Sequence, residues 1–213
     1  MNLGDLIPDP YLSRAALILL LPILLAAVLG APWKALLARR ERQNALGVAI
    51  ICLPLLWSMS PELPGGARLQ LLGMTTVALI FGWQLALIAG TLAAAVLIVV
   101  GTWPLQAVTL NLLLVVVVPV AVTMGVLWLA NRLRRTNLFI YMLGVAFGGS
   151  MLGLATSFLV GSWLFEPGLD HAVVLLITFP EGFLNGCLIS AFTVFYPELV
   201  RTYDDVRYLG KGG

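Results

Sequence analysis

Long apolar runs without a charged side chain dominate the sequence, and residues 84–102, QLALIAGTLAAAVLIVVGT, show this pattern most clearly. A helix that crosses a bilayer needs about 20 mostly apolar residues. Hydrophobic residues make up 61% of the chain and charged residues only 10%, whereas an ordinary soluble domain has about 25% charged residues. Such an excess of apolar side chains cannot fit inside one soluble core. The sequence therefore predicts an all-α, polytopic membrane bundle, with residues 1–213 forming a single integral membrane domain.

Seven apolar segments are candidates for transmembrane helices. They comprise residues 12–31, 44–59, 69–82, 84–102, 111–131, 137–163 and 171–197. Two of them, 44–59 and 69–82, are short for a full crossing, and Pro54 interrupts the first. We therefore expect the helix at 44–59 to be broken or tilted, and the loop SPELPGGARL that follows it to fold back into the bundle.

The apolar run from 69 to 102 is long enough to be read as one helix or as two. A single helix of about 34 residues is roughly 50 Å long, which exceeds the ~30 Å hydrocarbon core of a bilayer. The stretch FGWQ at 81–84 offers a corner, because Gly82 permits a tight turn and Trp83 suits the membrane interface. The sequence therefore predicts two helices in this run.

The distribution of lysine and arginine predicts the orientation of the bundle. With seven helices and the N-terminus outside, the cytoplasmic loops hold Lys34, Arg39, Arg40, Arg42, Arg132, Arg134, Arg135, Arg201, Arg207 and Lys211. The outside loops then hold only Arg14 and Arg68, and such an asymmetry is typical of inserted bundles. We expect a multi-pass protein of a bacterial inner membrane with a cytoplasmic C-terminus. The basic segment KALLARRERQN at 34–44 lies near anionic lipid headgroups or forms a docking surface.

The sequence lacks the motifs of several functional classes. It has no Walker A loop, no Gly-rich nucleotide motif and no Cys/His zinc spacing, and the tail RTYDDVRYLGKGG is too short for a soluble domain. We therefore predict no enzymatic activity, no cofactor and no metal-ligating residues, which leaves open whether a metal binds as substrate. A net charge of +2 is too small to indicate nucleic acid binding. Cys52 and Cys187 are expected to be small buried hydrophobes. The acidic start MNLGDLIPDP lacks the features of a cleaved signal peptide, so we expect it to be retained.

Small residues repeat every four positions in two of the predicted helices. The stripes are Gly149, Gly153, Ser157 and Gly161 in segment 137–163, and Ala26 with Gly30 and Ala27 with Ala31 in segment 12–31. Small side chains let helix backbones approach closely in lipid. These stripes serve either packing within the bundle or docking of a partner membrane protein.

The stretch FPEGFLNG at 179–186 places Glu181 in the middle of the last apolar segment. An ionised acid at the centre of a spanning helix costs about 2.5–3.5 kcal/mol, so Glu181 is expected to face a polar interior. Pro180 removes a backbone donor there, and Gly182 permits another backbone to come close. Three interpretations follow: a protonated, hydrogen-bonded structural latch, a direct or indirect contact to a bound cation or polar ligand, and a proton relay. Asn185, one turn later on the same face, suits any of them.

Other polar residues lie near the predicted outer face. Gln70 is at the outer end of segment 69–82, and Asn111 is at the start of segment 111–131, where we expect it to cap its helix. His171 begins the last segment, close to Glu166 and Asp170. This histidine is either simply solvated or helps the two acids attract cations.

Three stretches, PGGARLQLLGMT, TLNLLLVVVVPV and FPEGFLNGCLISAFTVFYPELV, give the chain a resemblance to a known family. The chain resembles the membrane-embedded, substrate-binding S components of energy-coupling factor (ECF) transporters, in particular the cobalt- and nickel-type (CbiM-like) branch. The resemblance implies a bundle that captures its substrate from outside. It also implies docking, through small residues of the first helix, on a membrane coupling protein whose ATPase subunits are separate chains.

The positions that hold the metal in that family differ here. Its metal importers begin with Met-His, bind the metal through the terminal amine and that histidine, and carry a second histidine just before LLG. This chain has Asn2 and Gln70 at those positions. Because an amide oxygen is a poor ligand for these metals beside imidazole, we do not expect nickel or cobalt specificity to carry over. A pocket near the outer face would be lined by Asn2, Gln70, Asn111, Glu181 and Asn185.

The sequence thus favours a substrate-capture subunit of an ECF-type importer for a small solute or cation, surrounded by membrane lipid and energised by partner chains. The solute would enter between the loop at 60–70 and the N-terminal arm. The alternative is an accessory or assembly subunit of another membrane complex without a transport role, which the sparse polar lining also fits. An intramembrane enzyme would need a nucleophile or metal beside Glu181, and the sequence offers no paired catalytic group.

Overall fold

The computed structural model describes residues 8–60, 70–132, 137–165, 171–204 and 208. Their α-helices are α1 (Pro10–Gly30), α2 (Trp33–Leu37), α3 (Arg40–Ser58), α4 (Met74–Phe81), α5 (Trp83–Val99), α6 (Val108–Leu112), α7 (Val118–Arg132), α8 (Gly149–Phe165) and α9 (His171–Phe195). The π-helical segment Leu113–Val117 joins α6 to α7, and a second one, Ile140–Gly148, leads into α8. The described residues include no strand, so the predicted all-α class is confirmed.

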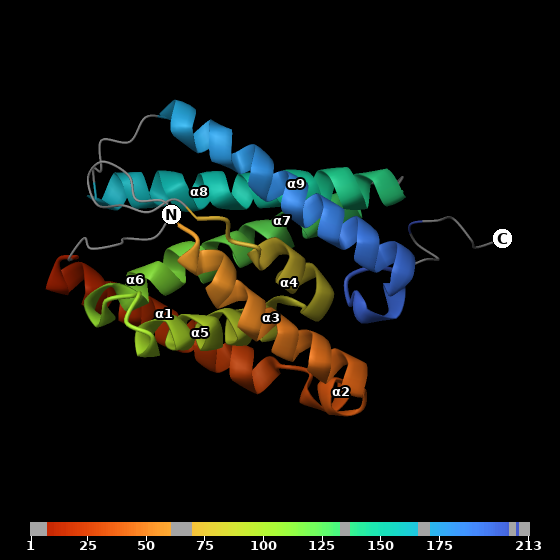
Figure 1. Ribbon diagram of the computed structural model, residues 1–213, viewed down its shortest axis with the longest axis horizontal. Coiled ribbons are helices and arrows are strands. Elements are labelled where there is room, and N and C mark those ends of the chain that lie inside the picture. The colour runs from red at the N-terminus through yellow and green to blue at the C-terminus, as the bar shows by residue number, and fades with distance from the viewer. Residues whose placement is uncertain (1–7, 61–69, 133–136, 166–170, 205–207, 209–213) are drawn as a thin grey trace.

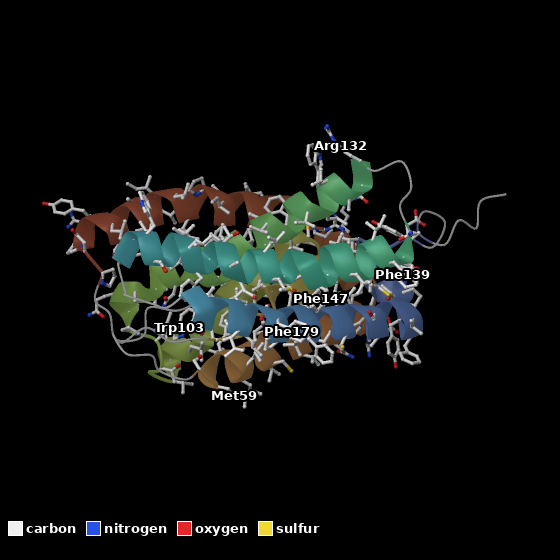
Figure 2. The ribbon with its side chains drawn as sticks, turned by 90° about the horizontal axis from the view of Figure 1, so that it is seen from above. Met59, Trp103, Arg132, Phe139, Phe147 and Phe179 are labelled. Atoms are coloured by element: carbon white, nitrogen blue, oxygen red, sulfur yellow. The ribbon has the colours of Figure 1, made fainter. Side chains whose placement is uncertain are left out.

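The helices form two groups with α4 between them. Figure 1 shows α1, α3 and α5 on one side and α7, α8 and α9 on the other, and α4 packs against α5, α7, α8 and α9. Every residue of α4 is buried. Figure 2 shows the two ends of the bundle, with Trp103 toward one end and Arg132 and Phe139 toward the other.

Four helical runs among the described residues are long and apolar enough to cross a membrane. They are Pro10–Gly30, Leu105–Arg132, Ile140–Leu164 and Leu176–Phe195. Their outer surfaces carry exposed large apolar side chains, for example Ile18, Leu29, Leu159 and Val194, as lipid-facing helices do. These features bear out a membrane helical bundle. The orientation with the N-terminus outside stays a prediction.

Two of the shorter predicted segments differ from the structure. The helix expected at 69–82 begins only at Met74, because Gln70–Gly73 run as non-helical chain and Gly73 takes a left-handed conformation with φ 65°. The eight-residue helix that remains is roughly 12 Å long, too short to cross a bilayer alone. Of the two expectations for the helix at 44–59, broken or tilted, the break is wrong, because α3 continues through the buried Pro54. The tilt stays a prediction.

The corner between α4 and α5 is confirmed. Gly82 lies between Phe81 and Trp83 with φ 84° and ψ 164°, a conformation that is essentially restricted to glycine. The loop SPELPGGARL at 60–69, which was expected to fold back, lies outside the described residues except for Ser60.

The small-residue stripe of α8 packs inside the bundle. Gly149, Gly153, Ser157 and Gly161 are all buried. A Cβ atom on Gly153 would lie 3.3 Å from the Cα atom of Pro119 in α7. Of the two interpretations of this stripe, the structure supports packing within the chain, because a partner cannot reach its residues.

The stripes of α1 divide between the bundle and its surface. Ala27 and Ala31 are buried, whereas Ala26 and Gly30 are exposed. Only the second pair is therefore accessible for docking. The two cysteines correct another expectation, because both Cys52 and Cys187 are exposed free thiols on the outer surface of the bundle.

Candidate functional site at the start of helix α4

The carboxylate of Glu181 binds the backbone just before α4. Its Oε2 atom accepts a hydrogen bond from the Leu72 N–H at 2.7 Å, and its Oε1 atom accepts one from the Gly73 N–H at 3.0 Å. The side-chain amide of Asn185 donates to Oε1 at 2.8 Å. Glu181 is only 1% exposed, so it faces the interior and not the lipid, as its sequence context predicted.

Asn185 continues this contact one turn further along both helices. Its Oδ1 atom accepts hydrogen bonds from the Thr76 N–H at 2.9 Å and from the Thr76 hydroxyl at 2.7 Å. Its amide nitrogen also donates to the Glu181 carbonyl oxygen at 2.8 Å. Every polar atom of the Asn185 side chain is therefore engaged inside the chain.

The Glu181–Asn185 pair acts as an N-terminal cap that comes from another helix. The first N–H groups of an α-helix have no partner within the helix, and its N-terminus carries partial positive charge. The N-cap of α4 is Gly73, which has no side chain to supply an acceptor. Glu181 and Asn185 supply acceptors from α9 at the N-terminal end of this eight-residue helix.

The hydrogen bonds of Glu181 make it an internal link between distant parts of the chain. From the described residues its carboxyl group accepts three hydrogen bonds. A buried, hydrogen-bonded link of this kind corresponds to the latch interpretation, and the protonated form that was expected for the latch stays a prediction.

Gly182 lets the start of α8 and the segment before it come close to this cap. A Cβ atom on Gly182 would lie 2.7 Å from Cγ of Met151 and 3.2 Å from the Phe147 carbonyl oxygen. The ring of Phe147 packs edge-on against Phe179, with centroids 5.8 Å apart, and Figure 2 shows the two side chains near the middle of the bundle. The close approach expected at Gly182 is thus confirmed.

Aromatic and amide side chains lie on the other side of the segment 70–73. The indole of Trp57 donates to the Leu72 carbonyl oxygen at 2.9 Å and stacks on Trp103 with ring centroids 5.5 Å apart. Gln70 is 1% exposed, and its Oε1 atom accepts a hydrogen bond from the Ser60 hydroxyl at 3.3 Å. Gln70 therefore lies next to the cap of α4, two residues from the Glu181 contact at Leu72.

The C-terminal end of α4 is held by a segment that the sequence reasoning did not single out. The N–H groups of Arg201 and Thr202 donate to the carbonyl oxygens of Ile80 and Leu79 at 2.9 and 3.3 Å. The Arg201 guanidinium donates to the Phe81 carbonyl oxygen at 3.4 Å, where it faces the partial negative charge of the helix end. Thus α9 and the residues after it hold both ends of α4.

The remaining predicted site residues lie elsewhere or outside the described residues. Asn111 is fully buried inside α6, which packs on α1 and α5, and it does not cap its helix as expected, because that helix begins at Val108 after a 3-10 turn. Asn2 lies outside the described residues, as do Glu166, Asp170 and the side chain of His171. The structure thus brings together Glu181, Asn185 and the chain next to Gln70.

The side chains gathered at this site can donate and accept hydrogen bonds. In the described part of the chain, no three His, Cys, Asp or Glu side chains lie close enough to hold a metal ion. The groups that are present are buried amides, hydroxyls and one carboxylate beside two stacked indoles.

Comparisons with known proteins relate the chain to others through its fold. No protein-family model matches the sequence, and no curated protein is significantly similar. Among solved structures, a crystal structure of a transition metal transporter aligns over 100% of both chains with 18% sequence identity and a TM-score of 0.69. A crystal structure of a truncated transition metal transporter covers 93% of this chain and 98% of its own, with 18% identity and a TM-score of 0.68. The chain therefore shares its whole fold with transition metal transporters.

Proposed function

We propose that this chain is the membrane-embedded substrate-capture subunit of an ECF-type importer for a small solute or cation. One observation carries this proposal: the chain matches the fold of a transition metal transporter over the full length of both proteins. A similarity that covers the whole of both chains supports the proposal that the two proteins are molecules of the same type. It leaves the substrate to be argued from the site.

The residues near α4 favour a substrate other than nickel or cobalt. In the family that the sequence resembles, a histidine occupies the position of Gln70, and Gln70 is buried beside Trp57 and the cap of α4. An amide oxygen favours harder cations and hydrogen-bonding solutes over first-row metals. We therefore propose a polar solute or a hard cation as the substrate, with Gln70 and Asn2 among its ligands.

Energy for transport would come from partner chains in the inner membrane of a bacterium. The sequence contains no nucleotide-binding motif. The exposed pair Ala26 and Gly30 on α1 gives a coupling protein room for close helix contact, flanked by the exposed side chains of Leu25 and Leu29. Of the residues predicted to form the docking interface on α1, Ala26 and Gly30 are the pair that stays accessible on the surface of the fold.

A second candidate is an accessory subunit of another membrane complex. One observation favours it: donors and acceptors of the same chain already occupy Glu181 and Asn185, so neither side chain needs a solute. On this alternative the cap of α4 is purely structural.

Affinity purification from the native bacterium separates the two candidates. The tag belongs at the C-terminus, so that Met1 stays free, and mass spectrometry identifies the proteins that co-purify. We expect a membrane coupling protein with ATPase subunits, and we expect Gly30→Leu to lose them. The matched control is Gly144→Leu, since Gly144 is also an exposed helical glycine but lies far along the chain in Ile140–Gly148. Recovery of a different membrane complex without ATPases would establish the accessory role.

A further inference from the structure

Two arginines line a small recess at the end of α4 opposite to the Glu181 cap. Its walls are formed by the start of α3, the short helix α2, the corner between α4 and α5, and the segment after α9. The lining residues are Pro32, Ala35, Leu36, Arg42, Ile80, Phe81, Leu85 and Arg201. The free space has room for a group of about the size of a water molecule, such as one oxygen of a larger anion.

The guanidinium groups of Arg42 and Arg201 are held in place by backbone carbonyl oxygens. Arg42 donates through Nη2 to the Glu198 carbonyl oxygen at 2.9 Å, and Arg201 donates through Nη1 to that of Phe81 at 3.4 Å. The Nε atom of Arg42 is buried without a hydrogen-bond partner in the described structure. Within the same part of the chain no carboxylate pairs with either guanidinium, so only the partial negative charge of backbone carbonyl oxygens faces the two positive charges.

The surroundings of the recess indicate which kind of anion would reach the two arginines. The same short helix that contributes Ala35 and Leu36 to the wall exposes Trp33, Lys34 and Leu37. An exposed tryptophan, a lysine and a leucine on one short helix are typical of the boundary between headgroups and acyl chains. A soluble anion would find apolar surface there, whereas a lipid can place its acyl chains along α1 and α2.

We propose that this recess binds the phosphate group of an anionic phospholipid, with Arg42 and Arg201 as its donors. A phosphate oxygen in the recess would accept from the buried Nε–H of Arg42 and from the free N–H groups of Arg201. The bound lipid would then tie the start of α3 to the segment after α9 and, through Arg201, to the C-terminal end of α4. Basic pockets between helices on the cytoplasmic side of a membrane are known binding sites for such headgroups.

Native mass spectrometry of the detergent-solubilised full chain tests this proposal. The probes are phosphatidylglycerol and phosphatidylcholine with identical acyl chains, added at equal concentration. We expect phosphatidylglycerol to stay bound preferentially, and Arg42→Gln and Arg201→Gln each to weaken its binding about fivefold. Arg132→Gln is the matched control, because Arg132 is also an arginine but lies over the ring of Trp128 at the end of α7. Retained phosphatidylglycerol preference in the Arg42→Gln/Arg201→Gln double variant would overturn the proposal.

A second variant tests the same site without removing an arginine that holds the fold. Ala35 is exposed and lines the recess, so Ala35→Glu places a carboxylate beside the guanidinium groups at little cost to folding. We expect this variant to lose the preference for phosphatidylglycerol, while Ala35→Gln keeps it. Inorganic phosphate in the millimolar range distinguishes a free anion from a lipid. Occupancy by phosphate in lipid-free protein, together with equal binding of both lipids, would overturn the lipid assignment.

Discussion

Glu181 accepts the backbone N–H of Gly73 at 3.0 Å, across 108 residues of sequence. The contact joins α9 to the N-terminal end of α4, whose own N-cap residue, Gly73, has no side chain to accept a hydrogen bond. Arg201, twenty residues after Glu181, donates to the carbonyl oxygen of Phe81 at the other end of α4. The position of α4, and of Gln70 before it, therefore depends on the C-terminal quarter of the chain.

Replacing Glu181 with Gln is expected to destabilise the protein. The amide has one oxygen in place of two, so either the Leu72 or the Gly73 N–H loses its acceptor in the buried interior. An unsatisfied buried donor costs about 2 kcal/mol, and this loss lowers Tm by roughly 4–8 °C. Thermal unfolding in detergent measures the shift. Glu198→Gln is the matched control, because Glu198 is exposed and uses only its backbone oxygen in a hydrogen bond. Equal Tm values for both variants would contradict the capping role.

Substitutions of Asn185 test its interaction with Glu181 independently. In Asn185→Asp a carboxylate oxygen replaces the amide nitrogen that lies 2.8 Å from Glu181 Oε1, so two acceptors face each other. We expect a larger loss of stability than for Asn185→Ala, which only removes contacts. The swapped variant Glu181→Gln/Asn185→Asp restores a donor between the two side chains. Its unfolding temperature should lie above that of Asn185→Asp alone. A swap that adds the two losses would show that the side chains do not interact.

The sequence was sufficient to predict the class of fold and most of the helices, because lipid imposes length and apolar composition on each spanning segment. It also placed the corner at Gly82 and the interior position of Glu181. Each prediction rests on a residue that is compatible with few structures at its position. One is a glycine in the middle of an apolar run too long for one helix, and the other is an acid in a helix whose neighbouring residues are apolar.

The partners of these residues could not be predicted, because they come from distant parts of the chain. Nothing in MTTVALIF indicates that its N-terminus is capped from residues 181 and 185 or its C-terminus from residues 201 and 202. Hydropathy alone also extended this helix back to residue 69, since Leu71 and Leu72 are as apolar as the helix that follows. The small-residue stripes predicted close contact but could not assign it to the bundle or to a partner.

Gly82→Ala is expected to disturb the corner between α4 and α5 in two ways. A Cβ atom would be strained at φ 84°, and it would lie 2.8 Å from Nη1 of Arg201. Strain of this kind costs on the order of 1–3 kcal/mol. Gly101→Ala provides the comparison, since Gly101 also has a positive φ of 81° but has open space around its Cβ position.

The steric contribution of Arg201 can be isolated in a double-mutant cycle. In an Arg201→Ala background the clash is gone, so Gly82→Ala should lower Tm less than it does in the native chain. If the loss is the same in both backgrounds, the guanidinium does not pack against this corner.

Because α7 and α8 pack closely, we expect substitutions of Gly153 in α8 and Gly125 in α7 to have unequal effects on stability. A Cβ atom on Gly153 meets the backbone of Pro119 at 3.3 Å, and the backbone cannot move aside without separating the helices. We expect Gly153→Leu to prevent stable folding or to cost about 3 kcal/mol, and Gly153→Ala to cost about 1 kcal/mol. Gly125 on α7 is exposed with open space around it, so Gly125→Leu should leave Tm unchanged. Yield and Tm after purification compare the pair, and a tolerant Gly153 would contradict the close packing.

The predicted orientation can be measured by cysteine labelling from each side of the membrane. Because both native thiols are exposed, the background is Cys52→Ala/Cys187→Ala. Arg39 and Leu105 are exposed positions at the two ends of the bundle, in the turn before α3 and in the turn before α6. Basic residues concentrate near Arg39, so Arg39→Cys should react with an impermeant maleimide only from the cytoplasmic side. Leu105→Cys should react from the outside. Reaction of both positions from the same side would refute the seven-helix arrangement, because it requires an odd number of crossings between them.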